Sequence, residues 1–99
     1  IEGSYHVSLM KCGKVTANWD KILRTKECLP KGCWLYIIFD VPEVSRSVRD
    51  SFRQQLRRSG FHIVQRSVWR TNKNVELIIC EQIRLLKIAR WVTIIVGRS

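Results

Sequence analysis

The chain has 99 residues and a formal charge of +10, from 18 Lys and Arg residues against 8 Asp and Glu residues. A hydrophobic content of 45% excludes wholesale disorder. No apolar stretch approaches the roughly 18 residues that a membrane-spanning helix needs. The length fits one domain. This excess of positive charge is typical of proteins that bind polyanions, so we expect nucleic acid, and no membrane, as the partner.

The cysteines argue against a structural metal site. Chelating Cys-x-x-Cys pairs do not occur, and only two histidines are available as further ligands. We therefore interpret all four cysteines as free thiols of a protein in the reducing cytoplasm. They are Cys12, Cys28, Cys33 and Cys80.

The chain begins with Ile1, so we interpret it as a processed form or a piece of a longer protein. Residues 1–33 are expected to form an N-terminal extension to a domain over residues 34–99. The expected parts of the extension are a linker remnant over residues 1–4, a short strand over residues 5–10 and a short helix over residues 16–24. A cluster with proline and glycine then ends this section.

The stretch from Trp34 to Pro42 is the most informative one. Its near-continuous apolar run predicts a strand, over about Trp34 to Asp40, that is buried on both faces. Asp40 ends the run, where the chain leaves the core and a charge is cheaply solvated. A carboxylate at this position, followed by a basic segment, indicates a metal or phosphate site.

A helix is predicted from about Ser45, its N-cap, to about Ser59, with Gly60 as its C-terminal stop. An apolar stripe is expected to be buried; its members are Val48, Phe52 and Leu56. A second stripe beside it is basic; its members are Arg46, Arg49, Arg53 and Arg57. Like charges at this spacing repel unless something neutralises them, and Asp50 is the only acid of the helix. The basic stripe is therefore either a solvated face or a binding surface.

The remaining elements complete the pattern. Residues 61–71 are expected to form a strand pair that breaks near residues 65–67. Residues 75–90 favour a helix, with a strand over residues 75–80 as the alternative, and residues 91–97 are the last strand. This order predicts an α+β, ferredoxin-like split βαβ sandwich, in which two helices cover one face of an antiparallel sheet. The bare face predicts a homodimer.

Several of these segments together resemble a known family. They are the run from Trp34 to Pro42 with Glu43, the arginine helix, Gly60-Phe61, and the segment Gln65 to Trp69. Their order and spacing, over about residues 33–97, are similar to the CRISPR-associated protein two family. They are also similar to the related C-terminal domain of PaaX-type transcriptional repressors, whose pattern is the closer one. The resemblance implies a ferredoxin-like homodimer that handles nucleic acid.

The resemblance also implies a role for Asp40. In the CRISPR-associated family, strand-end aspartates of two protomers face each other and are thought to hold a divalent metal for phosphodiester hydrolysis. Asp40 matches that position, so Mg²⁺ and metal-dependent endonuclease activity, on RNA or DNA, are open expectations. The alternative is a carboxylate that favours the N-terminus of the following helix, or pairs with Arg46 or Arg49.

Other residues have simpler interpretations. Ser67 has no partners for a catalytic triad, so we expect a packed strand residue. Trp34, Trp69 and Trp91 are expected in the core or at the dimer interface. A sharper interpretation of Trp69 is stacking on an unpaired base.

Three functions compete at this point. The first is a non-catalytic dimer that contacts phosphates through arginine; the residues are Arg46, Arg49, Arg53, Arg57, Arg66 and Arg70. The second is a Mg²⁺-dependent endonuclease that uses Asp40 of both protomers as catalytic and metal-binding residue. The third is the dimerisation domain of a larger repressor whose winged helix reads the DNA.

Overall fold

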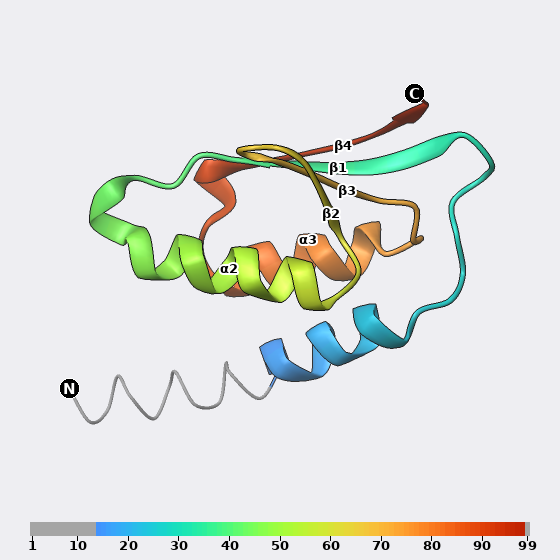
Figure 1. The fold of residues 1–99 in the computed structure, drawn as a ribbon. Helices are drawn as coiled ribbons and strands as arrows, with labels where there is room; N and C mark the ends of the chain where they lie inside the picture. Colours follow the sequence, from blue (N-terminus) through green and yellow to red (C-terminus); the bar gives the residue numbers. More distant parts are fainter. Residues whose placement is uncertain (1–13, 99) are drawn as a thin grey trace.

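The computed structural model describes residues 14–98 of the chain (Figure 1). The strand expected over residues 5–10 lies outside the described residues. The labelled elements follow in chain order: β1 (Cys33–Phe39), η1 (Glu43–Ser45), α2 (Arg46–Arg58), β2 (His62–Gln65), β3 (Val68–Thr71), α3 (Glu76–Leu85), η2 (Ala89–Trp91) and β4 (Val92–Arg98). A further helix covers residues 14–24.

The four strands form one antiparallel sheet in the order β2-β3-β1-β4. Each helix, α2 or α3, therefore connects two strands that a third strand separates, which is the split βαβ arrangement. Both helices lie on the same side of the sheet (Figure 1). The predicted α+β architecture, with helices on one face of an antiparallel sheet, is confirmed.

Strand β1 alternates in burial, although its sequence predicts burial on both faces. Leu35, Ile37 and Phe39 are buried beneath the helices. Ile38, on the opposite face, is 36% exposed, because no element described over residues 14–98 covers that face (Figure 1). An apolar strand with one open face exposes hydrophobic surface that a partner can cover.

The helix over residues 14–24 forms a further layer beneath α2 and α3 (Figure 1). Trp19 and Ile22 of this helix belong to the same core cluster as the sheet residues. The Trp19 ring lies 5.9 Å from the Phe52 ring of α2, and Asn18 donates a hydrogen bond of 2.9 Å to Glu81 of α3. The helix is thus packed on the domain that follows it.

Helix α2 differs from its prediction at its N-terminus and along its apolar stripe. Ser45 stands at the N-cap position, but its side chain makes no capping hydrogen bond, and it is the last residue of the 3-10 turn η1. Phe52 and Leu56 are buried as predicted. The prediction for Val48 is wrong, because this residue is 39% exposed and lines an open hollow between α2 and residues 14–24.

The second half of the domain contains the predicted strand pair, helix and last strand, and the strand pair and the helix are shorter than predicted. The strand pair breaks at residues 66–67, and β2 carries an irregularity between Ile63 and Gln65. The segment expected as one helix over residues 75–90 is helical only to Leu85 in α3. Lys87 then adopts a positive φ of 61°, and the turn buries Ile88 against the core. The helix therefore ends because the chain must return to the sheet.

Candidate nucleic-acid interface

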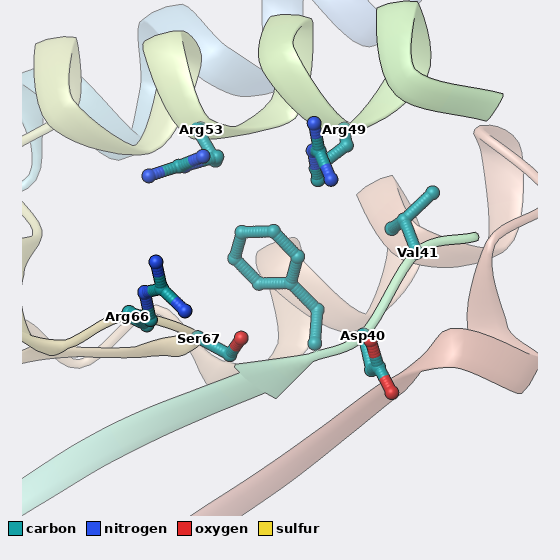
Figure 2. A pocket seen from close by; sticks show the side chains of 7 residues that line it. Asp40, Val41, Arg49, Arg53, Arg66 and Ser67 are labelled. Atoms are coloured by element: carbon teal, nitrogen blue, oxygen red, sulfur yellow. The ribbon is translucent and has the colours of Figure 1, made fainter. Parts of the chain in front are cut away.

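The end of β1 opens into a hollow of about 390 Å³ between the sheet and α2 (Figure 2). Three segments that are far apart in the sequence meet there: the residues after β1, the middle of α2 and the β2–β3 turn. The lining residues are Phe39, Asp40, Val41, Arg49, Arg53, Arg66 and Ser67. Four of the residues expected to form a site, Asp40, Arg49, Arg53 and Arg66, are thus brought together.

Backbone hydrogen bonds fix the relative positions of these segments. Phe39 N donates to Ser67 O over 3.1 Å, which ties the end of β1 to the β2–β3 turn. Asp40 N donates to Trp91 O over 2.9 Å, which ties the next residue to η2. The hollow is therefore built on the sheet itself, and α2 supplies its opposite wall.

Arg49 is a half-buried arginine of the hollow. Its side chain is 27% exposed, and its Nε atom is buried without a hydrogen-bond partner. A terminal nitrogen of its guanidinium lies 3.6 Å from Glu43, and Nε itself lies 3.5 Å from Asp50 without forming a hydrogen bond; both carboxylates are well exposed. Such pairs with solvated carboxylates contribute little, so Arg49 keeps unused donor capacity.

Asp40 lies at the rim of the hollow, and its carboxylate points away from the three arginines (Figure 2). Among residues 14–98 it forms no ion pair, while Arg46 and Arg49 both pair with Glu43. The alternative that Asp40 pairs with Arg46 or Arg49 is therefore wrong. The described residues also contain no group of three or more His, Cys, Asp or Glu side chains close enough to share a metal ion.

The other arginines of the predicted set lie elsewhere. Arg46 stands near the start of α2, 3.4 Å from Glu43. Arg57 stacks at 5.8 Å over the ring of Trp69. Arg70 stacks at 4.0 Å over the ring of Trp34. Because Arg70 pairs with Tyr36 of β1, it lies on the open face of the sheet. The six arginines therefore do not form a single surface.

Arg53 extends the basic surface beyond the hollow. It also lines a second depression along α2, together with Asp50, Gln54 and Arg57. A path of positive charge therefore leads from the hollow along α2.

Two further predictions change with the structure. Trp69 is 1% exposed, so the suggestion that it stacks on an unpaired base is wrong. Ser67, expected as a packed strand residue, lies in the turn and lines the hollow. The sequence does contain a sign of this position, because Ser67 follows Arg66 in the connection between two strands. A split βαβ fold brings that connection next to the end of β1.

The fold and this hollow together define a ferredoxin-like α+β domain with an arginine-lined site at the end of its first strand. A family model described as the PaaX protein central Cas2-like domain matches residues 30–99, more than two thirds of the chain. The chain belongs to this family, and the predicted PaaX-type and CRISPR-associated resemblance is confirmed. The family is described as a central domain, whereas the resemblance had suggested a C-terminal one.

Comparison with curated proteins and with solved structures gave no match. Within residues 14–98, none of the helices combines the length and apolar character needed to cross a membrane.

Proposed function

We propose that this domain is a dimeric nucleic-acid-binding module that contacts phosphates through its arginines. The observation that carries the proposal is the meeting of Arg49, Arg53 and Arg66 around one hollow, with further positive charge along α2. Guanidinium groups suit this role because they bind phosphate oxygens through paired hydrogen bonds. Contacts to phosphates do not distinguish one base sequence from another, so we expect little preference for particular nucleic-acid sequences.

The dimer would form through the open face of the sheet. Ile38 of β1 and Ile95 of β4 are 36% and 47% exposed there, and Val68 of β3 lies beside Ile38 in the sheet. Burying apolar side chains against a second copy stabilises a small domain whose own core is limited. A dimer would also double the number of phosphate contacts on one nucleic acid.

The test is a binding series on duplex DNA, single-stranded DNA and RNA at increasing salt. Each phosphate contact contributes roughly −0.9 to the slope of log affinity against log salt on duplex DNA. Arg53→Gln should weaken binding to all sequences and make this slope shallower by about one contact. Arg84→Gln, which removes an exposed arginine of α3, is the matched control. Affinity that is unchanged between low and moderate salt would contradict the proposal.

The Mg²⁺-dependent endonuclease remains a second candidate because of the direction of Asp40. Asp40 comes two residues after Ile38, so its side chain lies on the same side of the sheet as that of Ile38 and points away from the arginines (Figure 2). A dimer formed through the open face, with its two-fold axis near the end of β1, would bring two such carboxylates together. Their oxygens are ligands that Mg²⁺ accepts.

Incubation of each nucleic acid with Mg²⁺ or with a chelator separates this candidate from simple binding. Cleavage that depends on Mg²⁺ and is lost in a dimeric Asp40→Asn variant would support it. Cleavage that survives in that variant would exclude Asp40 as the catalytic and metal-binding residue.

Membership in a PaaX family supports a third role, as the dimerisation domain of a transcriptional repressor. In that role the isolated chain should dimerise but bind DNA weakly. The same binding series distinguishes it, because weak binding would then come with an intact dimer.

A further inference from the structure

The hollow at the end of β1 has the composition of an oxyanion site. Arg49 and Arg53 descend from α2, and Arg66 and Ser67 rise from the β2–β3 turn on the opposite side (Figure 2). Phe39, which is buried, also lines the hollow and contributes an apolar surface to it. Polar donors around an apolar surface are typical of sites that hold one small charged group.

The positive charges of this hollow are poorly compensated. Among residues 14–98, neither Arg53 nor Arg66 forms an ion pair. Arg49 reaches only the exposed carboxylates of Glu43 and Asp50, and its Nε lies 3.5 Å from Asp50 Oδ1 without forming a hydrogen bond. A buried donor without a partner is costly, and guanidinium groups gathered at one site repel each other. A bound anion would satisfy the donor and remove the repulsion.

We propose that this hollow binds a phosphate monoester. A monoester carries a charge of about −1.5 to −2 at pH 7 and three acceptor oxygens, whereas an internal phosphodiester carries one charge. Three guanidinium groups and the Ser67 hydroxyl match the richer acceptor. A hollow of about 390 Å³ also exceeds the space that a phosphate group alone requires, and it falls in the size range of small-molecule sites.

The monoester has two sources, a phosphorylated strand end and a small phosphorylated molecule. In its strand-end form the inference deepens the proposed function and rests on it. In both forms the same residues bind the same chemical group: Arg49, Arg53, Arg66 and Ser67. Asp40 takes no part, because its carboxylate points away from the hollow (Figure 2).

The experiment uses the full 99-residue chain and matched pairs of probes. One pair is a short single-stranded oligonucleotide with a 5′-phosphate and the same strand with a 5′-hydroxyl. The other pair is adenosine 5′-monophosphate and adenosine. Affinities are measured by calorimetry, and the Nε–H resonances of the arginines are followed by NMR to locate the binding.

At least one phosphorylated probe should bind about tenfold or more tightly than its unphosphorylated partner, which is the usual scale for charge-assisted hydrogen bonds. Arg53→Gln and Arg66→Gln should each abolish this preference, and Arg53→Lys should lose most of it because the paired donors are gone. Arg58→Gln is the matched control. Arg58 belongs to the same helix but does not line the hollow, so the preference should persist.

The outcomes separate the two sources and the two proposals. A preference confined to the oligonucleotides assigns a strand end, and a preference in the adenosine pair assigns a small phosphorylated molecule. Equal affinity within both pairs would overturn the inference, as would a preference that survives in both Arg53→Gln and Arg66→Gln. Salt-sensitive binding to duplex DNA in the absence of any such preference would leave the proposed function standing alone.

Discussion

Lys73 donates a hydrogen bond of 3.0 Å from Nζ to the carbonyl oxygen of Ser59, just beyond the end of α2. The same ammonium group reaches Ile22 O and Leu23 O at 3.1 and 3.2 Å, in the last turn of the helix over residues 14–24. The C-terminal ends of helices carry unpaired carbonyls and partial negative charge. One lysine therefore holds two helix ends together, from a segment that follows β3.

Replacing Lys73 should test this junction. In Lys73→Met, the alkyl chain is retained but three carbonyls lose a charged donor, so the free energy of unfolding should fall by about 2 kcal/mol. Urea denaturation followed by tryptophan fluorescence measures the change. Lys31→Met, at an exposed turn, is the control and should change stability by less than about 0.5 kcal/mol. Equal stability of both variants would contradict the role of Lys73.

Gly60 makes the close approach of Lys73 possible. Its φ is +98°, and a Cβ added there would lie 3.1 Å from Lys73 Nζ. Gly60→Ala should therefore destabilise the domain by about 1–2 kcal/mol through backbone strain, with a further loss from the displaced ammonium. Gly97→Ala is the control, because a Cβ at Gly97 has no neighbour within 4 Å among the described residues. Thermal unfolding of the two variants should differ clearly in midpoint.

The open sheet face is the expected dimer interface, and a charge at its centre should break the dimer. Ile38→Asp places a carboxylate among exposed apolar side chains, so dimerisation should weaken while the circular dichroism of the monomer is retained. Sedimentation equilibrium over a range of concentrations measures the effect. Leu77→Asp alters an equally apolar residue that is exposed on α3, and it should leave association unchanged. A dimer that survives Ile38→Asp would locate the interface elsewhere.

Cys80 offers a prediction about pH. Cys80 is exposed as a residue, but partial burial of its thiol raises the pKa of that group, and the negative charge of Glu76 raises it further. Because the thiolate is the reactive form, alkylation of Cys80 should require a higher pH than that of an ordinary thiol. In Glu76→Gln the pKa should fall, so the alkylation rate at a fixed pH below it should increase.

Peptide mass spectrometry after iodoacetamide treatment resolves the individual cysteines. The rate at Cys28, which is also exposed, is followed in the same samples as a reference for reagent and pH. An unchanged rate at Cys80 in Glu76→Gln would show that the carboxylate has no influence on the thiol.

The architecture was predictable because several local signals agree. The apolar run of β1, the glycine after α2 and the break in residues 61–71 each indicate a boundary, and their order permits few topologies. The length of α3 was not predictable from pattern. Residues 86–90 are good helix material, yet the chain turns at Lys87 so that Ile88 enters the core. Tertiary packing overrides local propensity there.

The candidate site was only partly accessible from sequence. A helical wheel places Arg46, Arg49, Arg53 and Arg57 on one stripe of α2. In the structure, these arginines contact different parts of the domain and do not act as one surface. Arg49 and Arg53 face the β2–β3 turn, whereas Arg57 lies over the Trp69 ring. These differences depend on contacts between segments that are distant in the sequence. The periodicity of a single helix cannot reveal such contacts.

The register of β1 separates opposite charges at the end of one strand. Seven residue pairs with β4, from Cys33 to Phe39, place Phe39 on the helix side, so that Asp40 turns toward the open side. A slip of one residue would exchange these sides and carry the carboxylate in among the guanidinium groups. The hollow would then be occupied by its own counter-ion. Strand pairing remote from the arginines thus keeps them available to an outside anion.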